Sequence, residues 1–207
     1  MSQAKVSRTV ARAAATHRAI VDAAEHFLLE GGAEALTLEA VAERADVAVQ
    51  TIYNRVGGRS ALLIAVAERA LEEVRHYVDV AYASTGTPVE RILKAAQAYS
   101  RFAAERPHQF RLLADPPNEP TALGRISDIL DEENGKLAAA IREGMADGSI
   151  NPSLNPQVVA TTLWAAMNGI LALHWRRDRG RADEPQLEEL VNTMIEMLTD
   201  GLFRQSH

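Results

Sequence analysis

The fold of this chain is decided by residues 37–63, which read TLEAVAERADVAVQTIYNRVGGRSALL. The spacing of the apolar residues predicts two short helices around a tight turn, followed by the start of a third helix. In the second helix, expected at about residues 48–54, Val49, Ile52 and Val56 can face inward. The other positions carry side chains that can hydrogen-bond: Gln50, Thr51, Tyr53 and Asn54. Such a face is typical of a helix-turn-helix, whose second helix contacts the base edges and phosphates of DNA.

Composition favours a folded protein with a narrow range of chemistry. The chain has 207 residues, 47% of them hydrophobic, which is enough apolar material for a sizeable core. It contains no cysteine, so disulfides, thiolate nucleophiles and cysteine-based zinc sites are excluded. No apolar run approaches the roughly 20 residues that a membrane span needs, and the N-terminus lacks the hydrophobic segment of a signal peptide. We therefore expect a cytoplasmic protein that needs no cofactor and no metal and has no membrane partner.

The net charge of −6 is unevenly distributed along the chain. Residues 1–60 carry seven basic and seven acidic side chains, whereas residues 61–207 carry fifteen and twenty-one. Within the first 21 residues, the basic side chains stand without any acid: Lys5, Arg8, Arg12 and Arg18. This stretch is either a solvated, frayed terminus or a basic arm that contacts phosphates or the minor groove of DNA. Arg12 is included among the candidate DNA-binding residues.

Turn and capping signals predict about nine helices. All eight prolines lie from Pro88 onward, and most stand where a first helical turn tolerates the missing N–H. The alternation of apolar and polar residues that marks strands is absent. We expect an all-α fold with helices at about residues 16–30, 38–45, 48–54, 59–83, 88–105, 107–114, 121–147, 156–177 and 185–203. Residues 1–60 would form the arm and a three-helix DNA-binding domain, and residues 61–207 a second helical domain.

The last two predicted helices carry the strongest apolar stripes. The final one follows a heptad-like spacing of four, three and four: Leu187, Val191, Met194 and Leu198. The one before it is lined by Leu163, Ala166, Met167, Ile170, Leu171 and His174. These stripes either join the core of one chain or pair with a second copy in a four-helix interface.

The helix-turn-helix segment resembles the TetR family of transcriptional repressors. The family pattern is matched between about residues 16 and 65 by Ala23, Ala24, Phe27, Thr37, Val47, Thr51, Tyr53 and Arg59. A later stretch, residues 147–169, resembles the regulatory domain of one branch of the family through Asp147-Gly148, Trp164 and Asn168-Gly169. The resemblance implies a homodimer that binds a near-palindromic operator and is released by a small effector. Residues 61–207 would then serve effector binding and dimerisation.

Four positions of the helix-turn-helix depart from the family pattern. Asp46 stands where the turn often has glycine, although aspartate tolerates a left-handed backbone at some cost. Ala48 replaces a serine, so a hydroxyl cap is lost. Val56 replaces an aromatic residue, and Arg59 replaces a lysine. We expect these changes to leave the fold intact but to make the operator sequence hard to carry over.

Each candidate DNA-binding residue has a role that fits its chemistry. Gln50 can bind adenine through its amide, Thr51 can reach a phosphate or a base, and Tyr53 offers its ring to a thymine methyl and its hydroxyl to a phosphate. Thr37 and Arg59, at helix N-termini, are candidate clamps on the DNA backbone, although capping alone explains Thr37 equally well. The full set is Arg12, Thr37, Gln50, Thr51, Tyr53, Asn54 and Arg59.

A second set of residues suits a mostly apolar pocket with few polar anchors. It consists of Tyr99, Phe102, Phe110, Trp164, Met167 and Asn168. For each aromatic residue the alternative is an ordinary place in the core. Asn168 is the most suggestive polar residue, because burying an amide costs free energy unless a partner bonds it.

Two other classes of protein remain as alternatives. Glu73-Val-Arg-His76 and Glu105-Arg-Pro-His108 resemble the Glu-x-x-His motifs of carboxylate di-iron bundles, but Pro107 interrupts the second motif. We therefore do not expect an enzyme or catalytic residues. The chain could instead be an all-helical interaction module that no longer binds DNA, which its acidity and the departures at Asp46 and Ala48 allow. A steep salt dependence of DNA binding would distinguish the two.

Overall fold

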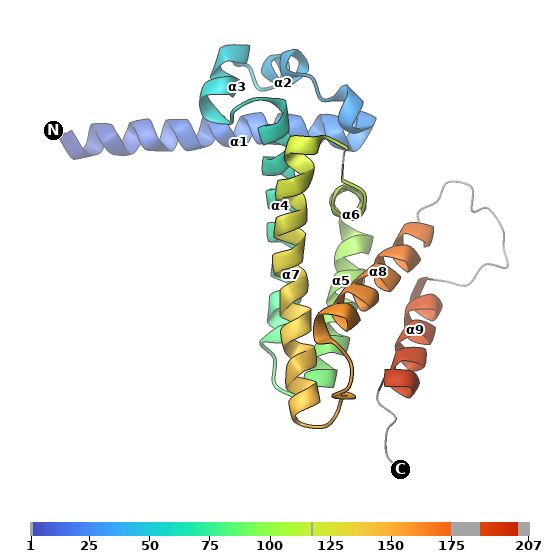
Figure 1. The fold of residues 1–207 in the computed structure, drawn as a ribbon. Coiled ribbons are helices and arrows are strands. Elements are labelled where there is room, and N and C mark those ends of the chain that lie inside the picture. Colours follow the sequence, from blue (N-terminus) through green and yellow to red (C-terminus); the bar gives the residue numbers. More distant parts are fainter. Residues whose placement is uncertain (1, 117, 175–186, 203–207) are drawn as a thin grey trace. The chain divides into compact units, whose positions relative to one another are not determined.

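The computed structural model describes residues 2–116, 118–174 and 187–202 (Figure 1). Across these residues it contains nine α-helices and no strand, which confirms the all-α prediction. The helices are α1 (Ser2–Ala35), α2 (Leu38–Arg44), α3 (Val49–Arg55), α4 (Arg59–Tyr82), α5 (Pro88–Glu105), α6 (Pro107–Ala114), α7 (Pro120–Ala146), α8 (Pro156–His174) and α9 (Leu187–Leu202). The ends predicted for the last two helices at residues 175–177, 185–186 and 203 lie outside the described residues.

The chain forms two compact units. The first is Met1–Leu71 with Asp115–Ser127, and the second is Glu72–Ala114 with Asp128–His207. The predicted division after residue 60 differs from these units, because α4 continues as one helix past Leu71 and contributes to both. We keep residue 60 as a proposal for where the DNA-binding function ends.

Helix α1 begins far earlier than predicted, at Ser2 and not at about Thr16. The basic segment is therefore a helix and not a frayed arm. The physical reason is local, because no glycine or proline precedes Gly31 and alanine, the best helix former, is frequent. The predicted break at Gly31-Gly32 is present, since Gly32 has φ 71° and ψ −171°, a conformation that glycine adopts readily.

The first unit has its core where the helices α1 to α4 meet. Helix α1 packs against α2 and α3, and α2 packs against α3. The apolar residues that face this centre are fully buried and include Ile20, Ala24, Val41, Ile52 and Leu62. Burying each large aliphatic side chain contributes about 1.5–3 kcal/mol, so the short helices α2 and α3 are stabilised by packing and not by their length.

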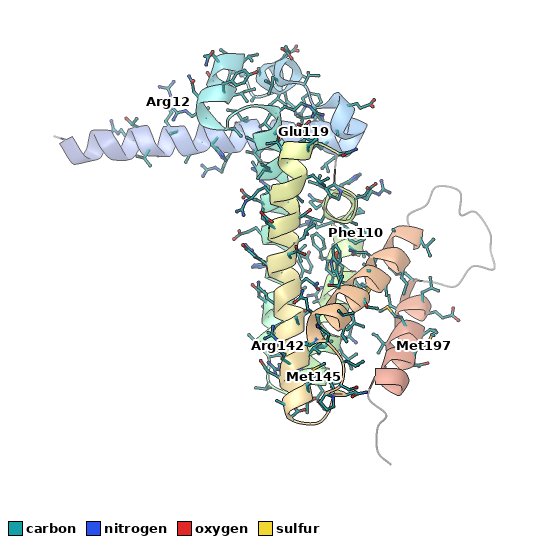
Figure 2. All side chains as sticks on the ribbon, viewed as in Figure 1. Arg12, Phe110, Glu119, Arg142, Met145 and Met197 are labelled. Atoms are coloured by element: carbon teal, nitrogen blue, oxygen red, sulfur yellow. The ribbon has the colours of Figure 1, made fainter. Side chains whose placement is uncertain are left out.

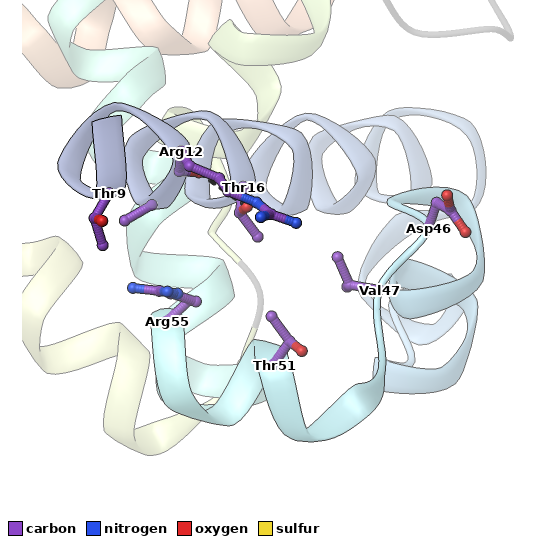
Figure 3. Close-up of a pocket in the computed structure, with 8 residues that line it drawn as sticks. Thr9, Arg12, Thr16, Asp46, Val47, Thr51 and Arg55 are labelled. Carbon is purple, nitrogen blue, oxygen red and sulfur yellow. Dashed lines mark hydrogen bonds between the residues drawn. The ribbon is translucent and has the colours of Figure 1, made fainter. Parts of the chain in front are cut away.

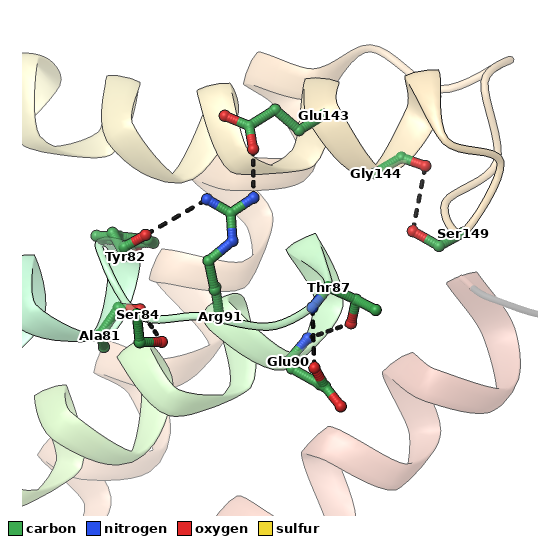
Figure 4. A network of polar contacts seen from close by, with 9 residues as sticks. All are labelled: Ala81, Tyr82, Ser84, Thr87, Glu90, Arg91, Glu143, Gly144 and Ser149. Atoms are coloured by element: carbon green, nitrogen blue, oxygen red, sulfur yellow. Dashed lines mark hydrogen bonds and ion pairs between the residues drawn. The ribbon is translucent and has the colours of Figure 1, made fainter.

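The second unit consists of the end of α4, helices α5 and α6, most of α7, and helices α8 and α9. Its core includes Ile92 on α5, Ile141 on α7 and Ala160 on α8, together with Ile150 from the turn between α7 and α8. At the start of α5, Thr87 and Glu90 form a capping box, in which each side chain accepts a hydrogen bond from the other's backbone N–H (Figure 4). Arg91 then donates to Glu143 on α7 and, at 3.4 Å, to the carbonyl of Tyr82 on α4. These contacts fasten the turn between α4 and α5 to α7.

Helix α8 is apolar but poorly covered. Its window Pro156–Leu173 is long and apolar enough to cross a membrane by length and composition, and only 22% of it is buried. Its 18 residues come close to the length of a membrane span, in contrast to the expectation that no apolar run does so. One such helix is poor grounds for a membrane protein, because helices that pack against other proteins have the same composition.

The predicted seam of the last helix is only partly available to a partner. Val191 is 6% exposed and therefore belongs to the core of its own chain, as do Met167 and Leu171 on α8. Leu187 and Met194 are half-buried. The side chains of Leu198 and His174 lie outside the described residues. The apolar surface left uncovered on these helices is a different one, with Val158 and Leu173 on α8. On α9 it includes Met197 (labelled in Figure 2).

Candidate nucleic-acid interface and regulatory site

One side of helix α3 packs into the core of the first unit, and the other side is exposed to solvent. Ile52 is 0% exposed, while Tyr53 is 51% exposed and Gln50 and Asn54 are also on the surface. Thr51 is half-buried. The Gln50 Nε2 atom donates to the Asn54 Oδ1 atom at 3.2 Å. Each amide has further donors and acceptors, so this ordered pair can still bind a base edge.

The turn before α3 has the two peculiarities expected from its sequence. Asp46 has φ 52°, so it adopts the left-handed conformation without being glycine. Left-handed backbone at a residue with a Cβ atom costs roughly 1–2 kcal/mol, and aspartate bears it better than most. Ala48 is the N-cap of α3 and supplies no side-chain hydrogen bond. The departures from the family pattern therefore leave the turn in place.

Tyr53 is oriented by the glycine pair that precedes α4. A Cβ atom added at Gly58 would lie 3.3 Å from the Tyr53 Cε1 atom, so the ring lies directly against the backbone there. Gly58 also has φ 109°, a value that side-chain-bearing residues rarely adopt. The Tyr53 side chain is thus exposed on one side and packs against the backbone of Gly58 on the other.

Thr37 and Arg59 are both engaged within the first unit. Thr37 caps α2, accepting a hydrogen bond from the backbone N–H of Ala40 at 3.2 Å. The guanidinium of Arg59 donates to the carbonyls of Ala33 at 2.7 Å and Leu36 at 3.2 Å, and to Glu119 at 2.7 Å. A phosphate contact from Arg59 would therefore require an exchange of partners, and its role as a clamp stays a prediction.

Glu119 was not anticipated from the sequence. It lies just before α7 and also accepts a hydrogen bond from the Ser60 hydroxyl at 3.0 Å. One carboxylate therefore holds the first two residues of α4, while Arg59 ties α4 to the turn between α1 and α2. No local signal could reveal this contact, because about 60 residues separate the partners.

An open polar groove of about 460 Å³ runs between α1 and α3 (Figure 3). It is lined by Thr9, Arg12, Ala13, Thr16, Asp46, Val47, Thr51 and Arg55. Two predicted DNA-binding residues, Arg12 and Thr51, thus share one surface. Arg55 is a further basic residue that the sequence analysis did not single out, although it stands four positions after Thr51 and hence on the same flank of α3.

In the second unit the six candidate effector residues converge. The Tyr99 hydroxyl donates to the Asn168 Oδ1 atom at 2.8 Å and accepts a hydrogen bond from Trp164. The Tyr99 ring stacks on Phe102, with 6.1 Å between the centroids, and meets Phe110 edge-on at 6.0 Å. The sixth residue, Met167, is buried and accepts a hydrogen bond from Ser100 at 3.6 Å.

The cluster combines an apolar floor with a small set of paired polar groups. Phe102 is 0% and Phe110 is 1% exposed, so both are core residues of the unit. Burial raises the pKa of the Tyr99 hydroxyl above its ordinary value, and the hydrogen bond from Trp164 opposes this only in part. Tyr99 is therefore a neutral donor at physiological pH. Its bond to Asn168 offsets the cost of burying the amide.

The two Glu-x-x-His motifs do not assemble. Helix α5 ends at Glu105 and α6 begins at Pro107, so Glu105 and His108 stand on different helices. Glu105 instead accepts a hydrogen bond from Tyr77 at 2.5 Å, and Glu73 pairs with Arg106 at 3.2 Å. No group of three or more histidine, aspartate or glutamate side chains in the described ranges could hold a metal ion.

Two family models match this chain. Residues 20–66 match bacterial regulatory proteins of the tetR family, and residues 92–198 match the tetracyclin repressor-like C-terminal domain, which covers half of the chain by itself. A curated relative is the HTH-type transcriptional repressor KstR of Mycolicibacterium smegmatis, 40% identical over 73 residues. That match spans 35% of this chain and 36% of KstR, so the chain matches only about a third of this relative's length.

Solved structures share the fold over nearly the whole chain. The regulator FadR from Bacillus subtilis, in complex with stearoyl-CoA, has a TM-score of 0.75 at 19% identity and covers 89% of this chain and 98% of its own. AibR, in complex with isovaleryl coenzyme A and operator DNA, has a TM-score of 0.67 at 19% identity and covers 91% and 98%. With both halves of the chain matched by the family models, this protein belongs to the TetR family of transcriptional regulators, which bind DNA and are not enzymes.

Proposed function

We propose that this protein is a ligand-responsive repressor that binds a near-palindromic operator as a homodimer and leaves it when an effector binds. The observation that carries the proposal is the surface of α3, where Ile52 is buried while Gln50, Tyr53 and Asn54 project outward. A twofold dimer would set two such helices about 34 Å apart, in successive major grooves. A protein with this role works in the cytoplasm, where the DNA is.

Contacts to the operator are assigned by chemistry. Gln50, already ordered by Asn54, would bind adenine through its amide. Tyr53, held against Gly58, would contact a phosphate or a thymine methyl. Thr37, Thr51, Arg12 and Arg59 would contact the DNA backbone.

The dimer is proposed to form through α8 and α9. Helix α8 is apolar, is mostly uncovered in the single chain and packs against α9. Val158 is 61% and Met197 is 71% exposed, and exposed apolar surface of this kind marks interfaces. Sedimentation should show a dimer for the wild type and a monomer for Val158→Glu with Met197→Glu. A dimer that survives both charges would place the interface elsewhere.

The effector is proposed to be an acyl thioester of coenzyme A, whose acyl chain lies against the aromatic cluster. Two structures with the same fold hold such molecules, namely FadR with stearoyl-CoA and AibR with isovaleryl coenzyme A. The cluster of Tyr99, Phe102, Phe110, Trp164, Met167 and Asn168 supports this class, because its floor is apolar and its polar groups are few. An effector of this kind acts by preferring the conformation that does not fit the operator.

The test uses fluorescence anisotropy with a DNA duplex selected by the protein from a random pool. Binding should weaken steeply with salt and should be lost or reduced in Tyr53→Ala and Gln50→Ala. Stearoyl-CoA and isovaleryl-CoA are then titrated separately against the complex. The compound whose acyl chain fits the aromatic cluster should lower the operator affinity about 5- to 150-fold. If no duplex is selected, the proposal is wrong and the chain is better described as an interaction module that does not bind DNA.

A further inference from the structure

The flank of α3 that faces α1 carries two arginines without ion pairs. Arg12 comes from α1 and Arg55 from the last turn of α3, and both project into the groove between these helices (Figure 3). Neither guanidinium forms an ion pair with a carboxylate in the part of the chain that the structure describes. This contrasts with Arg59 in the same unit, whose guanidinium is bound three times.

The position of this groove on α3 follows from helical geometry. With about 100° per residue, Gln50 and Asn54 lie at the middle of the outward face, Tyr53 lies on one flank, and Thr51 and Arg55 lie on the other. A recognition helix in a major groove about 12 Å wide has a phosphate strand on each side. With DNA in this position, Tyr53 would face the strand on the α4 side, and the groove with Arg12 and Arg55 would face the strand on the α1 side.

We propose that this groove binds the phosphate backbone of the DNA strand on the α1 side of α3, with Arg12 and Arg55 as the two cations. The proposal rests on the proposed DNA-binding function and extends it from the outward face of α3 to the groove that α3 forms with α1. Because α1 is a helix from Ser2 onward, Arg12 is held in place opposite Arg55 and is not carried on a loose arm. Preorganisation of this kind lowers the entropy lost on binding.

Two threonine hydroxyls of the groove differ in whether they already donate a hydrogen bond within their own helix. The Thr16 hydroxyl donates to the carbonyl of Arg12 at 3.0 Å, so its proton is already used within α1. Thr51, one turn before Arg55, is the hydroxyl that we assign as a donor to the phosphate. Asp46 is the acid of the groove and lies at the end away from Arg55 (Figure 3). Its negative charge would repel the phosphate, so removing this charge provides a second test of the assignment.

The chain offers a matched control on the same helix. Arg18 is exposed like Arg12 and carries the same charge, but it does not line the groove. Six positions separate the two residues, which at about 100° per residue turns Arg18 well away from the side of α1 that Arg12 and Thr16 occupy. General attraction to DNA would treat the two arginines alike, whereas a built site would not.

The experiment measures anisotropy for Arg12→Ala, Arg55→Ala and Arg18→Ala from about 50 to 300 mM salt. The probes are the selected duplex and a random-sequence duplex of equal length. For Arg12→Ala and Arg55→Ala, we expect affinity to fall roughly 5- to 10-fold at 0.1 M salt on both duplexes, and the salt slope to lose about 0.9 per substitution. Arg18→Ala should change neither quantity appreciably. Asp46→Asn, which keeps the left-handed backbone, should bind more tightly.

Three outcomes overturn the inference. The first is an equal effect of Arg18→Ala, the second is an unchanged salt slope in Arg12→Ala and Arg55→Ala, and the third is a loss confined to the selected duplex. If Gln50→Ala and Tyr53→Ala still weaken binding in those cases, the proposed function stands and only this groove is wrongly assigned. Circular dichroism melts of all variants confirm that the helices remain folded.

Discussion

On α3, Gln50 and Asn54 are exposed and bond to each other, whereas in the second unit Tyr99 bonds to Asn168 and Trp164 above buried phenyl rings. The first arrangement leaves donors and acceptors turned outward and adds little to the stability of the fold. The second uses its polar groups to complete a core. Substitutions on α3 should therefore weaken operator binding and spare stability, whereas substitutions in the cluster should lower stability and leave the operator-binding surface intact.

The largest expected effect is on stability and comes from Phe102→Ala. Phe102 is fully buried and meets both Tyr77 and Tyr99, so its removal leaves a cavity. We expect the free energy of unfolding to fall by about 3–5 kcal/mol in urea denaturation. Tyr53→Ala is the matched aromatic control on α3 and should change stability by only about 0.5 kcal/mol. Equal losses for the two variants would remove the distinction between the regions.

The second effect is on sequence discrimination and comes from Gln50→Ala. If the amide binds one adenine, the variant should lose roughly 1–3 kcal/mol of discrimination at that base pair and none at the others. Gel shifts with singly substituted operators measure this. Asn54→Ala, which removes the partner of Gln50, should have a smaller effect at the same base pair. Unchanged binding of every operator by Gln50→Ala would show that the Gln50 amide does not contact an adenine.

Local signals explain most of what the sequence predicts correctly. The prolines and their capping residues mark helix starts, as the capping box of Thr87 and Glu90 shows. The left-handed turn at Asp46 and the outward polar face of α3 also follow from neighbouring residues alone. For the aromatic cluster the residue types were sufficient to name its members. That they meet in space depends on helices 69 residues apart, at Tyr99 and Asn168.

Other features of the fold depend on contacts between distant residues or on helix propensity, and the sequence patterns do not predict them. The early start of α1 was missed because a cluster of positive charge suggested a loose arm, although its alanines favour a helix. Glu119 was missed because its partners Arg59 and Ser60 are remote in the chain. For the stripe of the last helix the sequence leaves both the core and a partner possible, because heptad spacing cannot tell which neighbour a stripe will face; Val191 faces the core of its own chain.

The third effect concerns the carboxylate that holds the start of α4. Glu119→Gln weakens the bonds to Arg59 and Ser60, and both side chains of the ion pair are partly exposed, so we expect a loss of only about 1 kcal/mol in unfolding free energy. Operator affinity should rise, because Arg59 loses its carboxylate partner and only two backbone carbonyls then compete with a phosphate. Glu68→Gln is the control, since its 3.7 Å pair with Arg125 is half exposed. Weaker operator binding in Glu119→Gln would show that Arg59 positions α4 and does not clamp DNA.

The smallest effect is a dependence of stability on high pH that belongs to the cluster and not to α3. Burial raises the pKa of Tyr99, and also that of Tyr82, above the ordinary value of 10.0. Below pH 10 these hydroxyls are protonated in both the folded and the unfolded chain, so they give no pH dependence. Above pH 10 the unfolded chain loses the protons and the folded chain keeps them, so stability falls as pH rises.

Between pH 10 and pH 11, each of these tyrosines should remove about 1 kcal/mol from the free energy of unfolding. Urea denaturation at pH 8, 10 and 11 measures the loss, and the part due to Tyr99 should vanish in Tyr99→Phe. Tyr53→Phe should leave the wild-type loss unchanged, because the Tyr53 ring is half exposed and is not part of the buried cluster. A loss in Tyr99→Phe equal to that of the wild type would mean that this hydroxyl reaches solvent, and the cluster would then share the open character of α3.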